Sequence, residues 1–457
     1  MSIIDAIFDR EAHSLQEAFG TVDITSPEMR EAIKDWFKLY FSQTVEKDED
    51  PCQQIPYTVV SKLTKVAFAE YSWETSDKYA ETVMQTLDKH KEKAMSLAMI
   101  GGTVLLKPVP TPKGWAWVEI PRTNVLVFAR DESGAMTDIG TAEITKDGPY
   151  TYTLLERRQV DRNSYLTIRN QLYQTRAVAG TIGTRVPLAT LDKYAELPDE
   201  YTYTVPIGLG VVEVSLPMTN SVDGSADAVS VYAKATGLIH NINHNEHQIN
   251  VEYDNAKSRL GVSADLAQKG KEHCKQFDDD VFLLIDDDPE SIGFNVFSPA
   301  IRDESFFNRK REYLRNVETV IGLRRGLLSE VEEKERTATE INTTSGDYAV
   351  TVGDLQSMWS RAVADALTLC GTLGKLYKVN GASEIAEDAV SINWGNGILY
   401  DEEKEIERTL DLVARGMLRP EIGLAKILKM PYKTEADLQK IREKYMPKIE
   451  QLGVDEE

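Results

Sequence analysis

The sequence predicts an α+β protein with several domains, and three observations support this class. Apolar residues recur at helical spacing through the first hundred residues. Short runs rich in β-branched and aromatic residues, separated by turn residues, then fill 102–175, and long helical repeats return after residue 225. The 457 residues exceed what one compact core usually holds, so we expect about two to four domains.

The first hundred residues predict three helices. The first begins with Ser26 as its N-cap and Pro27 at its first helical position. The other two cover about 57–71 and 77–100, and the glycine pair at 101–102 ends the third helix.

The middle of the chain predicts a sheet followed by more helices. We expect one antiparallel sheet of about six strands over 102–175, and a loop-rich segment at 176–224 to which we assign no element. A helix of about 30 residues follows at about 226–259. A small insert with the strand "VFLLI" and a helix at 303–322 come next.

The most regular helical signal covers 338–378. Apolar residues there repeat at alternating spacings of four and three, from Ile341 to Leu376. The helix could pair as a coiled coil or form a long spine buried inside a larger assembly. Its four glycines suit close packing; they are Gly346, Gly353, Gly371 and Gly374. The strand "AVSINWGNGIL" and two helical stretches, "DEEKEIERTLDLVARGML" and "TEADLQKIREKYMPKIEQL", complete the chain.

A charged segment at 323–336 separates the two preceding helices. Its basic and acidic side chains nearly balance; they are Arg324, Arg325, Lys334 and Arg336 against Glu330, Glu332, Glu333 and Glu335. Thr337 and Glu340 fit a capping box that restarts the helix. Gly322 and Gly326 can act as flexible points before the loop.

Composition restricts the classes of function. The net charge of −22 is unfavourable for tight binding to nucleic acid, and it fits either simple solubility or a surface that must pass a polyanion without sticking. The three cysteines, Cys52, Cys274 and Cys370, lie far apart, which indicates a reducing compartment and no cysteine-built zinc site. We expect neither a membrane span nor a secretory signal.

The motifs of common enzymes are missing from the sequence. There is no GxxxxGK[ST] phosphate loop, no GxGxxG after a strand, no GxSxG and no HExxH. His240, His244 and His247 share one helix face, which leaves open a metal site, a pH-sensitive subunit contact or a solvated surface. The aspartates 278–280 and 286–288 suggest a two-metal nuclease or, alternatively, charged strand ends that prevent edge pairing.

The order of elements resembles the portal proteins of tailed double-stranded DNA bacteriophages, in the branch of long-tailed phages of Gram-positive bacteria. The resemblance rests on "SLAMIGGTVLLKPV", on "FSPAIRDESFFNRKREYLRNVETVIGL" and on the helix start "RTATEI". It implies a portal fold that begins with a wing at 1–224, which is helical at 1–101, an antiparallel sheet at 102–175 and loop-rich at 176–224. A stem helix at 225–259, a small α/β clip at 260–302 and a second stem helix at 303–322 would follow. The remaining regions would be a tunnel loop at 323–336, a long spine helix that returns to the wing at 337–416 and a helical crown at 417–457.

The resemblance also implies a function. Portals are rings of about twelve identical subunits at one capsid vertex, through which DNA is packaged and ejected. They carry no enzymatic activity or cofactor of their own. The implied partners are other copies of the chain, double-stranded DNA, a terminase, a head-tail adaptor, and the major capsid and scaffolding proteins. The implied location is the virion, with the host cytoplasm during assembly, and no membrane is involved.

The tunnel loop is the site that this resemblance assigns. Its channel residues are Arg324, Arg325, Leu327, Leu328, Glu330, Glu332, Glu333, Lys334, Glu335 and Arg336, with Gly322, Gly326, Thr337 and Glu340 as hinges and caps. Weak phosphate contact suits a sliding conduit, because a dense basic stripe would hold the DNA. The alternatives are a metal-dependent nuclease or hydrolase and another self-assembling coiled-coil scaffold.

Overall fold

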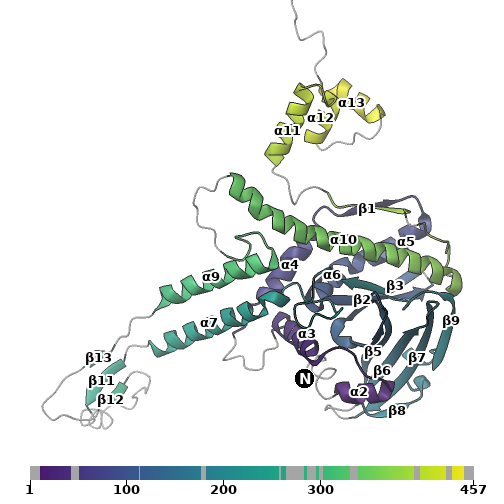
Figure 1. Ribbon diagram of the computed structural model, residues 1–457, viewed down its shortest axis with the longest axis horizontal. Coiled ribbons are helices and arrows are strands. Elements are labelled where there is room, and N and C mark those ends of the chain that lie inside the picture. Colours follow the sequence, from purple (N-terminus) through teal and green to yellow (C-terminus); the bar gives the residue numbers. More distant parts are fainter. Residues whose placement is uncertain are drawn as a thin grey trace, which may run out of the picture. The chain divides into compact units, whose positions relative to one another are not determined.

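A computed structural model shows how these segments fold (Figure 1). It describes residues 11–42, 51–112, 114–176, 182–256, 259–263, 282–285, 295–297, 302–329, 338–386, 388–395, 402–428 and 435–446. The chain divides into two compact units, Met1–Trp394 and Gly395–Glu457. Helices and antiparallel sheets are combined in the first unit, which confirms the α+β class.

The N-terminal part of the first unit is helical. Its helices are α2 (Glu11–Phe19), α3 (Pro27–Tyr40), α4 (Ile55–Ala67), α5 (Lys78–Leu87) and α6 (Lys91–Gly101). Ser26 caps α3 as predicted, because its hydroxyl accepts a hydrogen bond from the Met29 amide at 3.1 Å. The single helix predicted at 77–100 is wrong: a 3₁₀ turn at Asp88–His90 divides it into α5 and α6.

The β-rich segment forms two sheets instead of the single predicted one. Strands β2 (Thr103–Thr111) and β3 (Gly114–Pro121) join β10 (Val212–Ser215) in the order β10-β2-β3. The second sheet has the order β4-β5-β6-β7-β8, with β9 also paired to β7; its strands are β4 (Val125–Arg130), β5 (Met136–Asp147), β6 (Tyr150–Val160), β7 (Tyr165–Thr175), β8 (Thr184–Val186) and β9 (Glu200–Pro206).

Two expectations about these strands need correction for the same physical reason. A 3₁₀ turn at Arg122–Asn124 separates β3 from β4, so the chain leaves the first sheet there. The segment at 176–224, to which no element was assigned, supplies β8, β9 and β10. These strands pair with partners far away in sequence, and short strands without strong periodicity cannot be recognised from local pattern.

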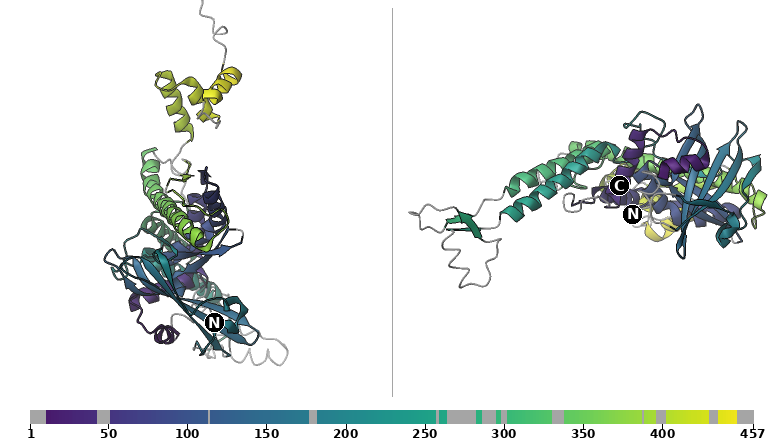
Figure 2. Two further views of the ribbon diagram at one scale, coloured as in Figure 1. Left: turned by 90° about the vertical axis from the view of Figure 1, so that its right-hand side faces the viewer. Right: turned by 90° about the horizontal axis from the view of Figure 1, so that it is seen from below.

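Helices α7 (Thr236–Asn255) and α9 (Asp303–Ile321) run side by side in opposite directions in Figures 1 and 2. The prediction for α9 is confirmed to within a residue, but α7 begins about ten residues later than the predicted start at 226. Hydrogen bonds to α6 explain the difference. The Val231 amide and the Ser230 hydroxyl both donate to the Met99 carbonyl at 2.9 Å, which holds this stretch against α6 instead of in a helix.

Between α7 and α9, the described residues form a small sheet. Strands β11 (Arg259–Ser263), β12 (Phe282–Ile285) and β13 (Asn295–Phe297) have the order β12-β11-β13, with β11 parallel to β12 and antiparallel to β13. The predicted strand "VFLLI" is therefore confirmed as β12. The aspartates 278–280 and 286–288 lie outside the described residues.

Helix α10 (Ala338–Tyr377) is 40 residues long and confirms the helix predicted at 338–378. It packs on α4, α5, β2 and β10 of the same subunit. From Tyr348 on, the described members of its apolar repeat are largely buried; they include Val352, Leu355, Trp359, Ala362, Ala366, Leu369 and Leu373. Trp359 meets Phe68, the residue that follows α4, edge to face, with ring centroids 5.8 Å apart. The described part of the repeat thus packs against elements of the same subunit.

A two-stranded sheet closes the first unit. Strand β14 (Val390–Asn393) pairs antiparallel with β1 (Ser72–Thr75), and Trp394 follows it. The Trp394 ring lies 4.9 Å from that of Tyr71, and its Nε1 donates to the Ser360 hydroxyl of α10 at 3.0 Å. These contacts attach the end of the unit to its helical core.

The second unit is helical in the residues described. It contains α11 (Glu402–Ala414), α12 (Pro420–Ile427) and α13 (Glu435–Tyr445). The sequence predicted α11 and α13 but not the short α12 between them. Arg442 of α13 pairs with the carboxylate of Glu421 in α12, with Nε and Oε1 2.7 Å apart. In the described part of the chain, no helix is long and apolar enough to cross a membrane.

Candidate functional site

The predicted loop begins where α9 ends, and this end has a defined geometry. Gly322 has a φ of +77° and occupies the left-handed position that terminates many helices. Its amide donates to the Thr319 carbonyl, and the Leu323 amide donates to the Glu318 carbonyl at 2.7 Å. This pair of bonds is a Schellman motif, and Leu323 is buried as such motifs usually require.

The side chain of Glu318 organises the next residues of the loop. Its carboxylate is fully buried and accepts hydrogen bonds from the amides of Gly326 at 3.1 Å, Leu328 at 2.5 Å and Ser329 at 2.9 Å. The Ser329 hydroxyl donates to its second oxygen at 2.8 Å. A buried carboxylate is stable only when such donors replace its lost water. Glu318 therefore fixes the turn at 326–329.

Two further contacts attach this turn to neighbouring helices. Lys62 of α4 donates to the Leu327 carbonyl, and Thr351 of α10 donates to the Gly322 carbonyl at 3.3 Å. In α10, burial raises the pKa of the Tyr348 hydroxyl, and the positive charge of Arg324 acts in the opposite direction. The first part of the loop, 322–329, is thus held by α9, α4 and α10; we call this segment the loop base.

The structure describes only some of the predicted site residues. Arg324, Arg325 and Gly326 are exposed, whereas Leu327 and Leu328 are half-buried. Gly322 and Gly326 both have positive φ angles, and both belong to the loop base. The remaining members are outside the described residues, as is the side chain of Glu340; they are Glu330, Glu332, Glu333, Lys334, Glu335, Arg336 and Thr337. The roles assigned to all of these residues remain predictions.

Sequence reasoning missed Glu318, although the sequence carries a signal for it. Leu314, Val317 and Ile321 form the apolar stripe of α9, and Glu318 occupies the remaining position of that stripe. An acid in the last turn of a helix is also unfavourable next to the negative end of the helix dipole. A carboxylate that lies both in an apolar stripe and at a helix C-terminus is expected to have a specific hydrogen-bonding partner. In this structure that partner is the loop base.

The three histidines do not come together at one site. His240 contacts Asp35 of α3, with Nε2 3.0 Å from Oδ2. His244 and His247 instead line a groove between α7 and α9, with their ring centroids 6.3 Å apart. Among the described residues, no three or more His, Cys, Asp or Glu side chains are placed to share a metal ion. The histidine positions therefore give no support to the metal interpretation.

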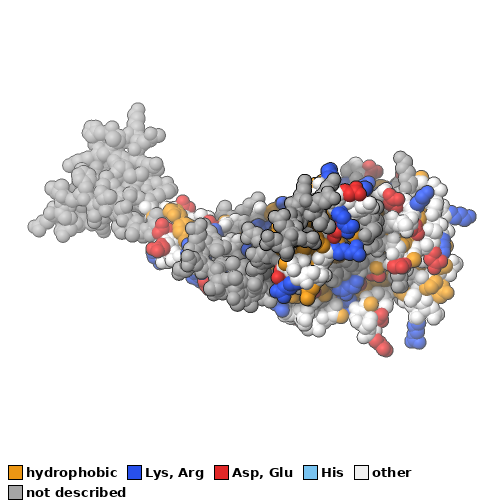
Figure 3. All heavy atoms as spheres, turned by 90° about the horizontal axis from the view of Figure 1, so that it is seen from above, with side chains coloured by type: hydrophobic (Ala, Val, Ile, Leu, Met, Phe, Trp, Pro, Cys, Tyr) orange, Lys and Arg blue, Asp and Glu red, His pale blue; other side chains and the backbone are white. Residues whose placement is uncertain are grey.

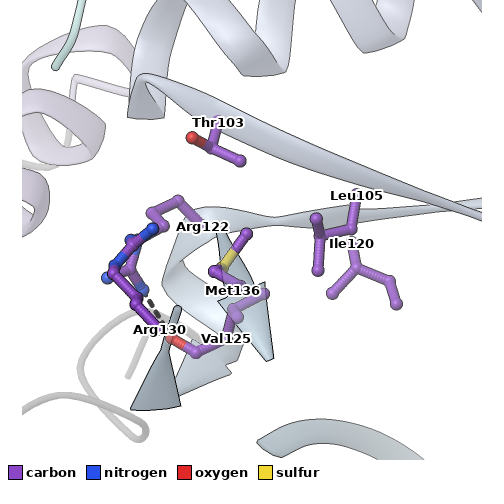
Figure 4. Close-up of a pocket in the computed structure, with 7 residues that line it drawn as sticks. All are labelled: Thr103, Leu105, Ile120, Arg122, Val125, Arg130 and Met136. Atoms are coloured by element: carbon purple, nitrogen blue, oxygen red, sulfur yellow. Dashed lines mark hydrogen bonds between the residues drawn. The ribbon is translucent and has the colours of Figure 1, made fainter. Parts of the chain in front are cut away.

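A crevice between the two sheets is also not a ligand site (Figure 4). It is lined mainly by apolar side chains and two arginines and has essentially no room for a water molecule. Arg122 and Arg130 both pair with the buried carboxylate of Asp227, at 3.2 Å and 2.6 Å. Arg122 also donates to the Val125 carbonyl at 2.6 Å. This buried network joins the start of β4 to the segment before α7 and thereby stabilises the fold.

The visible charges of the described residues are mixed rather than concentrated. Figure 3 shows Lys and Arg side chains interspersed with Asp and Glu over the face that it displays. A broad positive surface that would bind nucleic acid tightly is not seen on that face.

The fold is similar to that of chains in solved structures of GTA particle necks. A structure described as the neck of an empty GTA particle, computed with C6 symmetry, superposes with a TM-score of 0.50 over 91% of this chain and 98% of the other, at 12% sequence identity. The chain therefore shares the overall fold of the protein in that structure. A second structure, the neck of a native GTA particle computed with C12 symmetry, has a TM-score of 0.47 and 11% identity, and covers 93% and 99% of the two chains. No protein family and no curated protein matches the sequence.

Proposed function

We propose that the chain is a portal subunit that forms a ring of about twelve copies at a capsid vertex, through which double-stranded DNA passes. The observation that carries the proposal is the loop base. A charged loop joins two long helices, α9 and α10, and its first residues are fixed by the buried carboxylate of Glu318. In a chain with a particle-neck fold, this is the arrangement expected for a loop that must stay in position while DNA slides past it.

The proposal assigns a role to each region that was predicted from the sequence. The helices and sheets up to residue 224 form the wing, α7 and α9 form the stem, and the small sheet between them forms the clip that docks a head-tail adaptor. Residues 323–336 form the tunnel loop and the segment from 417 forms the crown. The terminase supplies the ATPase activity, and the chain itself has a structural role in the virion. The narrower assignment to long-tailed phages of Gram-positive bacteria rests on the quoted sequence stretches.

The coiled-coil alternative is less well supported than the ring. A coiled coil requires an apolar stripe that is available to a second helix. From Tyr348 on, where its side chains are described, the stripe of α10 is instead buried against α4, α5 and the β10 sheet of the same subunit, with Leu355 and Trp359 each 1% exposed. The remaining alternative, a metal-dependent hydrolase, receives no support from the described side chains.

Native mass spectrometry combined with negative-stain images of the purified chain tests the proposal. We expect closed rings of about twelve subunits with a central opening. A stable dimer or trimer over a wide concentration range would contradict the ring and favour a different scaffold. Metal analysis of the same sample tests the hydrolase alternative, which requires a stoichiometric transition metal that is lost in His244→Ala.

A further inference from the structure

The groove between α7 and α9 contains an unusual set of side chains. It has a volume of about 500 Å³ and is lined by His244, His247, Gln248, Val251 and Glu252 of α7 and by Arg302, Phe306 and Arg309 at the start of and along α9. Five of these eight side chains can donate hydrogen bonds, and Phe306 and Val251 contribute apolar surface. In a chain with a net charge of −22, a groove of this composition requires an explanation.

The one carboxylate that lines the groove, Glu252, pairs with an arginine and fixes its position. Glu252 and Arg302 form a bidentate pair, with Nε–Oε1 and Nη2–Oε2 distances of 3.0 Å and 2.8 Å. The hydrogen bond from Arg302 lowers the pKa of Glu252, so the carboxylate stays ionised. The guanidinium also lies 5.7 Å from the Phe306 ring centroid. Arg302 is thus held over the groove while its side chain remains 71% exposed.

Arg309 is positioned by a neutral group. Its Nε and Nη2 donate to the Tyr313 hydroxyl at 3.0 Å and 2.8 Å, and its guanidinium lies 5.4 Å from the centroid of that ring. A phenol orients the guanidinium without neutralising its charge. Among the lining side chains, two arginines face one carboxylate, which gives a formal charge of +1 with both histidines neutral.

We propose that this groove binds phosphate groups of a nucleic-acid backbone. Arg302 and Arg309 are two helical turns apart, about 10 Å along the axis at 1.5 Å per residue. That distance equals the axial rise of about three nucleotides of one DNA strand, at about 3.4 Å each. Repeated phosphates therefore fit the two guanidiniums better than a single small anion does. His244 and His247 provide further donors on the facing helix.

The inference rests on the proposed function, because it adds a second phosphate contact to the DNA conduit at a distance from the loop base. It differs from the loop in its physical character. The loop has nearly balanced charges, whereas the groove presents oriented guanidinium forks that suit phosphate oxygens. Each subunit would supply only a few such contacts, and their strength would fall steeply as the salt concentration rises.

Fluorescence anisotropy of a short labelled DNA duplex with the purified full-length chain, at about 50 mM salt, tests the inference. We expect Arg309→Ala to lower the affinity about threefold to tenfold and to reduce the salt dependence by about one phosphate contact. The matched control is Arg315→Ala on the same helix, outside the groove, for which we expect less than a twofold change. Thermal melting of both variants checks that the fold is intact.

The absence of measurable duplex binding would overturn the inference. Equal affinities of the Arg309 and Arg315 variants, together with an unaffected His244→Ala/His247→Ala double variant, would also overturn it. Competition by polyglutamate that is as effective as competition by DNA would do the same. Inorganic phosphate, compared with chloride at equal ionic strength, should compete weakly; complete displacement at millimolar concentration would assign the groove to free phosphate and overturn the nucleic-acid part. Ring formation is read separately by native mass spectrometry. If rings form but Arg309→Ala does not weaken duplex binding, only this inference is rejected. If Arg309→Ala weakens duplex binding but no rings form, only the proposed DNA conduit is rejected.

Discussion

At the scale of single residues, Glu318 has the greatest effect on the candidate site. We expect Glu318→Ala to lower the free energy of unfolding by about 2–4 kcal/mol, because four hydrogen-bond donors of the loop base lose their acceptor. Glu318→Gln retains one acceptor oxygen and should cost about 1–2 kcal/mol. Urea unfolding followed by tryptophan fluorescence measures both values.

The control for this prediction lies on the same helix. Glu312 is 65% exposed, so Glu312→Ala should change stability by less than about 0.5 kcal/mol. A local readout is limited trypsin digestion, since Arg324 and Arg325 adjoin the anchored turn. We expect faster cleavage there in Glu318→Ala than in Glu312→Ala. Equal cleavage rates would show that the carboxylate does not hold the loop base.

A second residue, Glu156, predicts how stability depends on pH. Its carboxylate lies between Lys107 at 2.5 Å and Arg158 at 2.7 Å. Burial alone would raise the pKa of Glu156, but the charges of Arg158 and Lys107 outweigh burial and lower it from 4.5 to about 2. Because the folded-state pKa is below the unfolded one, the stabilisation is complete above about pH 4.5 and is lost as the pH falls toward 2.

The measurement is the difference in unfolding free energy between the native chain and Glu156→Gln. Linkage gives about 3 kcal/mol for this difference at pH 7, decreasing to about half by pH 3. Comparing the two proteins at each pH cancels the contributions of other acids. A difference that does not change between pH 7 and pH 3 would mean that Glu156 has an ordinary pKa.

At the scale of elements, the sequence predicted what strong local patterns determine. Helix α10 was predicted to within a residue or so because its apolar repeat is long and regular. The segment before α7 was wrongly predicted as helix because hydrogen bonds to Met99 override its propensity. The division of the strands into two sheets depends on pairing between distant residues, such as Val214 with Val104, and no local pattern encodes it.

The candidate site was likewise predicted only in part from the sequence. Charge balance and the "RTATEI" helix start placed the loop between two helices, and α9 and α10 have the predicted bounds on either side. The anchoring of the loop base was not predicted, because it requires Lys62 and Thr351 from elements far away in sequence. Gly322 was predicted as a flexible point, whereas the structure uses its positive φ to terminate α9.

The glycines of α10 give a prediction for a matched pair of variants. A Cβ at Gly374 would lie 2.0 Å from the Tyr79 hydroxyl oxygen, and Tyr79 is fixed by a hydrogen bond to the Cys370 carbonyl at 3.0 Å. At Gly353 a Cβ would meet nothing within 4 Å. We expect Gly374→Ala to destabilise the subunit by about 1–3 kcal/mol and Gly353→Ala to stabilise it by about 0.5–1 kcal/mol.

Urea unfolding of both variants checks this pair, with ring formation as a second readout. If Gly353→Ala stabilises the fold but prevents rings, Gly353 is a close contact between subunits. If Gly374→Ala is neutral, the contact between α10 and Tyr79 is looser than the structure indicates.

At the scale of the whole molecule, the division into two units predicts where the chain can be shortened. The first unit ends at Trp394, directly after β14 has paired with β1. A chain ending at Gly395 retains this strand and the contacts of Trp394 with Tyr71 and Ser360. A chain ending at Ala386 loses all of them. We therefore expect the longer form to keep the stability of the first unit and the shorter form to lose about 2–4 kcal/mol or more.

Chemical unfolding of the two shortened chains provides the measurement, and Trp394→Ala in the full-length chain is the matched control. The point variant should reproduce much of the loss in the shorter form, because it removes the ring contacts while β14 remains. Equal destabilisation of both shortened chains would instead show that the helices after residue 395 stabilise the first unit. In that case the two units would fold as one, and the boundary drawn at Trp394 would be wrong.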